Sequence, residues 1–132
     1  MTHVFVYGTL RRGGTNHRLL AELGGQFVSE VRTRVGRTLV DLGPYPALLP
    51  LDVVRDASAS PVHGELFAVE PAALVPLDAF EGCPTLYFRE RVALADGHRS
   101  GAHEAWTYVL AARLAARLPG GARVLENGRY EG

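Results

Sequence analysis

The chain has 132 residues, of which 47% are hydrophobic, and fourteen basic side chains balance fourteen acidic ones, so the formal net charge at pH 7 is zero. This length predicts a single domain over residues 1–132 with one hydrophobic core. Nonspecific nucleic-acid binding and attraction to anionic membranes both depend on excess positive charge. We therefore predict that the protein binds neither nucleic acid nor membrane.

Residue counts exclude further classes of chemistry. All the basic residues are arginine, so the chain has neither a Schiff-base lysine nor the lysine of a Walker A phosphate loop. The single cysteine, Cys83, cannot form an internal disulfide or a multi-cysteine zinc site, and the histidines show no metal-ligand spacing. The N-terminus lacks a signal-peptide pattern, and no apolar run approaches the ~20 residues that span a bilayer. We expect a cytoplasmic protein without a bound metal.

The start of the chain predicts a strand, a glycine-rich loop and a helix. Residues 3–7 (HVFVY) are β-branched and aromatic without polar alternation, which is typical of a strand buried on both faces. Residues 8–14 (GTLRRGG) predict a loop. Thr15 or Asn16 can then cap a short helix, which runs through Leu23 and stops at two glycines.

The middle of the chain predicts mainly strands. A period of two residues favours strands over 26–33 and 35–42, and prolines bound a short strand at 47–49. Residues 56–61 (DASASP) have the composition of a solvated loop. A further strand is expected over 62–69 (VHGELFAV).

A helix is expected after this strand, because Pro71 fits the first turn of a helix. Its apolar stripe is formed by Leu74, Leu77 and Phe80, which recur at helical spacing. Pro76 falls inside the same pattern and predicts a kink or an irregular turn.

The remaining segments complete the predicted fold. Strands are expected over 86–95 and 103–110, and a helix over 111–118 (AARLAARL), which ends at Pro119. About six or seven strands and three short helices predict an α+β (mixed α/β) domain, either a small β-barrel or a strongly curled sheet.

The first candidate site is the stretch Tyr7-Gly8-Thr9-Leu10, where the buried strand breaks into the loop. Backbone N–H groups freed at such a break can point in a common direction and receive a carboxylate or an oxyanion. Gly8 has no Cβ and would let a ligand approach the backbone. A structural turn is the simpler interpretation of this pattern taken alone.

The second candidate is Glu81, at the end of the predicted apolar helix between Phe80 and Cys83. Partial burial would raise its pKa and let it act as a general acid or base near neutral pH. A solvated glutamate at a helix end is the alternative. For Cys83 a buried thiol is favoured over a nucleophile, because no base or catalytic motif accompanies it.

Several stretches carry a family resemblance when they are taken together. They are VFVYGTLRRG at 4–13, Asn16-His17, GRTL at 36–39, PYPALLP at 44–50, HGELFAV at 63–69 and LDAFEGCPTLYFRERV at 77–92. In this order and with these gaps they resemble the γ-glutamylcyclotransferase-like family, and within it the γ-glutamylamine cyclotransferases. The resemblance implies a small mixed β-barrel flanked by helices.

The resemblance also implies the functional residues. Tyr7, Gly8, Thr9 and Leu10 would form the substrate-binding loop, and Glu81 would be the catalytic carboxylate. Further implied residues are Tyr87 for substrate binding, and Arg89, Asn16 and Tyr45 as possible support.

The reaction that the resemblance implies is intramolecular. The α-amine of a γ-glutamyl group attacks its own side-chain carbonyl, closes 5-oxoproline and expels an amine, with Glu81 as general acid and base and without a cofactor. The expected partner is a small γ-glutamyl amine, γ-glutamyl-ε-lysine included. The alternatives are a γ-glutamyl amino acid or a γ-glutamylated biosynthetic intermediate as substrate, and a non-catalytic small-molecule binding module as a different class.

Overall fold

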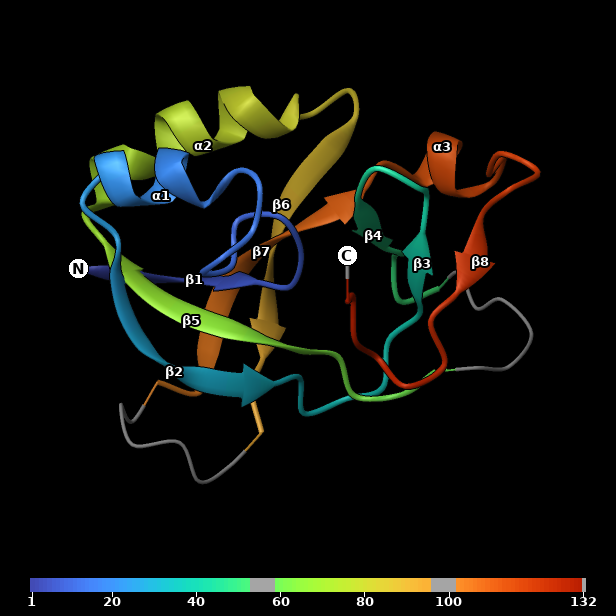
Figure 1. Cartoon of the computed structure of the whole chain (residues 1–132), viewed down its shortest axis with the longest axis horizontal. Coiled ribbons are helices and arrows are strands. Elements are labelled where there is room, and N and C mark those ends of the chain that lie inside the picture. Colours follow the sequence, from blue (N-terminus) through green and yellow to red (C-terminus); the bar gives the residue numbers. More distant parts are fainter. Residues whose placement is uncertain (53–58, 96–101, 132) are drawn as a thin grey trace.

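The computed structural model describes residues 1–52, 59–95 and 102–131, and its strands form one mixed, curled sheet (Figure 1). The strands are β1 (Thr2–Val6), β2 (Gln26–Arg32), β3 (Leu39–Asp41), β4 (Pro46–Leu48), β5 (His63–Val69), β6 (Tyr87–Ala93), β7 (Glu104–Leu110) and β8 (Arg123–Val124). The helical segments are α1 (His17–Glu22), the 3₁₀ turn η1 (Pro71–Ala73), α2 (Leu74–Glu81) and α3 (Ala112–Ala115). The predicted α+β class is confirmed. No helix in these ranges is long and apolar enough to cross a membrane.

The sheet forks at β7. One edge of β7 pairs antiparallel with β6 over the full length of both strands. Because a strand has only two edges, β1 and β4 share the other edge, where β1 pairs parallel beside Trp106 and β4 pairs parallel beside Val109. The chain leaves β1 between these two pairings, at Tyr7. The fork is therefore the place where the first candidate loop begins.

The sheet also curls back on itself. Thr33, just after β2, forms a bridge with Leu94, just after β6. Next to this bridge the N–H of Arg34 donates to the carbonyl oxygen of Ala93 at 2.9 Å. Strands β2, β5, β1, β7 and β6 thereby curl into a half-barrel, with one isolated bridge between the ends of β2 and β6, which agrees with the small barrel or strongly curled sheet that the sequence predicted.

Two hydrophobic clusters lie on the two faces of β1. Val4 and Val6 belong to a cluster that also takes buried residues of α1, α2 and α3. Phe5 and Tyr7 belong to the second cluster, together with buried residues of β4, β5, β6 and β7. In Figure 1, α1 and α2 lie on the same side of the sheet. The strand is apolar at successive positions because both of its faces are buried, as predicted.

The strand predicted over 35–42 is reduced to the three residues of β3. Before β3, Arg37 pairs with Ser60 only as an isolated bridge. Its side chain is 2% exposed, donates to the carbonyl oxygen of Leu49 at 3.1 Å and lies 3.2 Å from the carboxylate of Glu90. A buried guanidinium needs such partners, and they come from segments that a regular ladder would not bring together.

The C-terminal region differs from the prediction in two ways. The helix expected over 111–118 is limited to the four residues of α3, and β8 was not predicted. β8 has only two residues, which show no periodicity, and it forms because β3 offers a free edge. The predicted loop at 56–61 lies partly outside the described residues, which resume at 59.

The helix after β5 is irregular where prolines occur. Pro71 begins the 3₁₀ turn η1, and Pro76 falls within the first turn of α2, where N–H groups lack intrahelical acceptors in any case. Leu77 is fully buried, as predicted, but Phe80 is 47% exposed and does not belong to the core.

Candidate active site

Tyr7 fills the fork between β1 and β4. Its hydroxyl donates to the carbonyl oxygen of Tyr108 at 2.6 Å and accepts from the N–H of Leu48 at 3.2 Å. The side chain thus joins β7 to β4 at the point where β1 leaves the sheet. Burial raises the pKa of Tyr7 well above its usual value, so the hydroxyl stays neutral and keeps donating.

The loop after Tyr7 is held through its carbonyl and side-chain oxygens. The carbonyl oxygen of Gly8 accepts from the backbone N–H of Arg11 at 3.1 Å and from its Nε at 3.0 Å. The carbonyl oxygen of Thr9 accepts from the N–H of Asn16 at 2.9 Å, and Asn16 Nδ2 donates to Thr9 Oγ1 at 2.9 Å. Asn16 stands at the N-cap position of α1, as predicted, but its side chain holds the loop instead of capping the helix.

The N–H groups at the start of the loop differ from those of Arg11, Arg12 and Gly14, which donate within the described protein. Within the described ranges no acceptor is assigned to the backbone N–H groups of Gly8, Thr9 and Leu10. A Cβ on Gly8 would lie 2.7 Å from Cγ of Pro46, so glycine is needed here for contact with the opposite wall. This differs from the sequence interpretation, in which Gly8 made room for a ligand. The three N–H groups remain free to bind an anionic oxygen.

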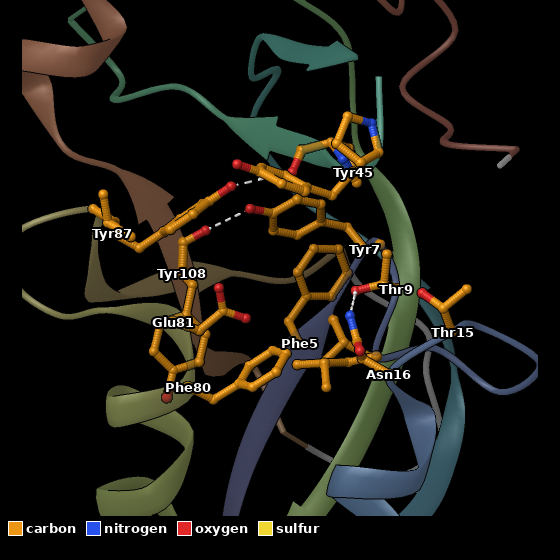
Figure 2. Close-up of a pocket in the computed structure, with 16 residues that line it drawn as sticks. Phe5, Tyr7, Thr9, Thr15, Asn16, Tyr45, Phe80, Glu81, Tyr87 and Tyr108 are labelled. Carbon is orange, nitrogen blue, oxygen red and sulfur yellow. Dashed lines mark hydrogen bonds between the residues drawn. The ribbon is translucent and has the colours of Figure 1, made fainter. Parts of the chain in front are cut away.

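A cavity of about 510 Å³ lies between this loop and α2 (Figure 2). It is lined by Phe5, Val6, Tyr7, Gly8, Thr9, Leu10, Thr15, Asn16, Pro44, Tyr45, Pro46, Phe80, Glu81, Leu86, Tyr87 and Tyr108. Eight of the nine residues singled out from the sequence are therefore brought together, although they come from five separate parts of the chain. The exception is Arg89. The roles assigned to the eight remain predictions.

Glu81 is the one charged residue in this described lining. It ends α2, and Gly82 follows with φ 72°, the left-handed conformation that stops a helix. Burial raises the pKa of Glu81 to about 7. Among the residues that the structure describes, no hydrogen bond or ion pair to its carboxylate is recorded. The carboxylate can therefore both accept and release a proton near neutral pH.

A separate polar network fixes α2 against the sheet. Asp78, one turn before Glu81, accepts from the hydroxyl of Tyr108 at 2.7 Å and forms an ion pair with Nε of Arg89 at 3.0 Å. The guanidinium of Arg89 also stacks over the ring of Trp106, 4.4 Å from its centroid. Arg89 therefore supports the helix that carries Glu81 and does not line the cavity.

Some lining residues were missed by sequence reasoning. Phe5 and Tyr108 were assigned only to strands, and Phe80 to the core. Tyr108 lies far from Glu81 in the chain and no local motif marks it. Cys83 is half-buried, whereas the favoured interpretation was a buried thiol. Desolvation raises the pKa of the thiol to about 11 and keeps it protonated near neutral pH.

Comparison with known proteins identifies the family. The model of the gamma-glutamyl cyclotransferase, AIG2-like family matches residues 4–131. The gamma-glutamylaminecyclotransferase of Homo sapiens is 42% identical over 112 residues, covering 79% of this chain and 70% of that protein. A putative gamma-glutamylcyclotransferase of Vibrio cholerae is 35% identical over 106 residues, covering 80% and 79%. The crystal structure of an AIG2-like protein from Mus musculus superposes with a TM-score of 0.77 at 28% identity, covering 99% and 88%. The chain belongs to this family of enzymes, as the motifs indicated.

We expect Tyr7→Phe to destabilise the fold by about 1–3 kcal/mol, because the change leaves a buried carbonyl of Tyr108 and a buried N–H of Leu48 without their shared partner. The free energy of unfolding in urea measures this loss. Tyr45→Phe is the matched control, since its ring is 44% exposed and no hydrogen bond of its hydroxyl is recorded within the described residues. Equal stabilities of the two variants would contradict the role assigned to the Tyr7 hydroxyl.

Proposed function

We propose that this protein is a γ-glutamylamine cyclotransferase, which converts γ-glutamyl amines into 5-oxoproline and a free amine. The observation that carries the proposal is one cavity lined both by Glu81, with a pKa of about 7, and by Gly8, Thr9 and Leu10, whose N–H groups lack acceptors within the described chain. The named activity of the relatives supports the same reaction.

Glu81 would serve as base and then as acid. The α-amine of the substrate is mostly protonated near neutral pH, and the carboxylate accepts its proton. The amine nitrogen then attacks the γ-carbonyl carbon, and a five-membered ring closes. Protonated Glu81 returns the proton to the amide nitrogen, the original carbon–nitrogen bond breaks, and the amine leaves. The ring nitrogen, which still holds two protons after the attack, releases one of them to the departing amine, so the products are 5-oxoproline and an ammonium ion. No water and no cofactor enter the balance.

The loop and the cavity walls would supply position and charge stabilisation. The N–H groups of Gly8, Thr9 and Leu10 can hold the substrate's α-carboxylate or the oxyanion of the tetrahedral intermediate. Both reacting groups belong to one molecule, so the walls have only to hold a folded conformer in which the amine lies near the carbonyl.

The charge of the cavity favours amines over amino acids as leaving groups. A γ-glutamyl amino acid carries a second carboxylate next to the scissile nitrogen, close to where Glu81 must act. The described lining has no arginine or histidine that could pair with this second carboxylate, and Glu81 would repel it when ionised.

A substrate panel tests the proposal. Purified protein is incubated with γ-glutamyl methylamide, γ-glutamyl-ε-lysine, γ-glutamyl-alanine and γ-glutamyl-glutamate, and 5-oxoproline is measured by mass spectrometry. We expect product from the first two and at least tenfold lower kcat/KM for the last two. Absence of product from every member would reject the enzyme assignment in favour of a binding module. Preference for the amino acids would reject the amine assignment.

The pH dependence of kcat/KM follows from the raised pKa of Glu81. The free enzyme must hold Glu81 as a carboxylate to accept the proton, so we expect kcat/KM to fall about tenfold per pH unit below about 7 and to level off above it. An inflection near 4.5, the ordinary value for glutamate, would show that the group is not desolvated as the structure has it.

A further inference from the structure

Three large apolar side chains surround the mouth of the cavity, and none of them takes part in the proposed proton transfers. Tyr45 is 44% exposed, Phe80 47% and Leu86 51%, yet all three line the cavity. Tyr45 comes from the β3–β4 turn, Phe80 from the end of α2, and Leu86 from the position just before β6. Such a cluster of exposed apolar side chains around a pocket commonly marks a binding surface. We call these three residues the apolar rim.

Two residues of the rim, Phe80 and Leu86, lie next to Glu81, to which the proposed function assigns the leaving nitrogen. Phe80 directly precedes Glu81, and the N–H of Leu86 donates to the carbonyl oxygen of Gly82 at 2.9 Å, which holds Leu86 against the end of α2. In Figure 2 the carboxylate of Glu81 lies between Phe80 and the tyrosine rings of the opposite wall. The substituent on a nitrogen that receives its proton from Glu81 therefore lies close to Phe80 and Leu86.

The rest of the substrate cannot occupy the rim. The glutamyl part must fold so that its amine meets its own carbonyl, and its charged ends need Glu81 and the loop N–H groups. Only the substituent on the amide nitrogen extends away from this folded ring. On the basis of the proposed function, we propose that the apolar rim binds the leaving group and selects amines with an apolar aliphatic or aromatic substituent.

A homologous series of substrates measures the preference directly. We expect kcat/KM to rise from γ-glutamyl methylamide through propylamide to pentylamide, by about two- to fourfold per added methylene, because each methylene leaves water for the rim. The γ-glutamyl ethanolamide has nearly the size of the propylamide but ends in a hydroxyl, and we expect it to react several-fold more slowly. A flat series, or an ethanolamide equal to the propylamide, would overturn the proposal.

Variants assign the preference to the rim itself. Phe80→Ala and Leu86→Ala are each expected to lower the pentylamide-to-methylamide ratio of kcat/KM by at least threefold. Val75→Ala is the matched control, because Val75 is an apolar residue of the same helix, is 73% exposed and lies outside the cavity lining. We expect Val75→Ala to leave the ratio unchanged. Phe80, Leu86 and Val75 are about half exposed or more, so we expect all three variants to keep a melting temperature close to that of the wild-type protein.

The outcomes separate this proposal from the proposed function. A complete absence of 5-oxoproline, including from the methylamide, rejects the cyclotransferase activity itself. If the methylamide is turned over but kcat/KM does not rise from methylamide to pentylamide, only the proposed leaving-group site is rejected. If Phe80→Ala and Leu86→Ala leave the pentylamide-to-methylamide ratio of kcat/KM unchanged, the proposal is also overturned. If light scattering then shows that these variants change the oligomeric state, the rim is a contact between copies of the chain.

Discussion

Glu81→Gln is expected to lower kcat by about 10²–10⁴-fold, the usual contribution of a positioned general acid or base. Glutamine has nearly the shape of the carboxyl group but can neither take the proton of the α-amine nor return one to the leaving nitrogen. Binding of the substrate should change little, because the loop N–H groups are unaffected. Release of 5-oxoproline under single-turnover and steady-state conditions measures the loss.

Stability provides an independent check on this variant. Since burial raises the pKa of Glu81 to about 7, the folded protein keeps a proton that the unfolded chain loses above about 4.5. The ionisation of Glu81 should therefore lower the free energy of unfolding of the wild-type protein as the pH rises from 4.5 to 7. Glu81→Gln has no group to ionise at this position and should not show this decrease. We expect the variant to gain in melting temperature relative to wild type across this range.

Glu70→Gln is the matched control, because Glu70 is exposed and precedes the same helical region without lining the cavity. It should show wild-type turnover and a wild-type dependence of stability on pH. If Glu81→Gln kept near-wild-type release of 5-oxoproline, the proposed role of Glu81 as acid and base would be wrong, whatever the stability data showed.

Gly8→Ala is expected to impair both stability and turnover. The new Cβ would lie 2.7 Å from Cγ and 2.9 Å from Cδ of Pro46, whose ring cannot rotate away. Overpacking of this kind costs about 1–3 kcal/mol. The loop must move away from Pro46, which displaces its N–H groups, and a displacement of about 1 Å at a reacting centre can cost about 10²-fold in rate. Urea unfolding and kcat/KM measure the two effects.

A double-variant cycle tests the cause. Pro46→Ala removes the two atoms that the new Cβ would meet, so Gly8→Ala should cost less in the Pro46→Ala background than in wild type. Gly120→Ala is the control for adding a methyl group, because nothing lies within 4 Å of the corresponding Cβ. An equal cost of Gly8→Ala in both backgrounds would show that contact with Pro46 is not the reason for glycine at this position.

Local sequence patterns predicted much of this molecule correctly. The apolar run of β1 predicted a strand buried on both faces, and the strand occupies the centre of the sheet with a hydrophobic cluster on each side. The glycine-rich break after it and the end of an apolar helix at Glu81 were both singled out as candidate sites, and both line one cavity. Short-range sequence patterns predict these features because the burial of a strand, the position of a loop and the end of a helix depend mainly on residues that are close together in the chain.

Other features could not be predicted, because they depend on contacts between distant segments. Arg37 interrupts the expected strand over 35–42 in order to reach its buried partners. Phe80 has the spacing of a core residue but faces the cavity, because α2 lies against the sheet along its Leu77 side. Tyr108 carries no local signal, yet it holds both Tyr7 and Asp78.

By itself, the sequence determined the absence of lysine chemistry, the class of fold, and the loop and the carboxylate proposed for the reaction. Only the tertiary structure decided that the loop and Glu81 share a cavity, that Pro46 makes Gly8 necessary, and that the Glu81 carboxyl has a pKa of about 7. The reason is that desolvation, close packing and strand pairing are properties of residues brought together from distant parts of the chain, whereas propensity and charge belong to the residues themselves.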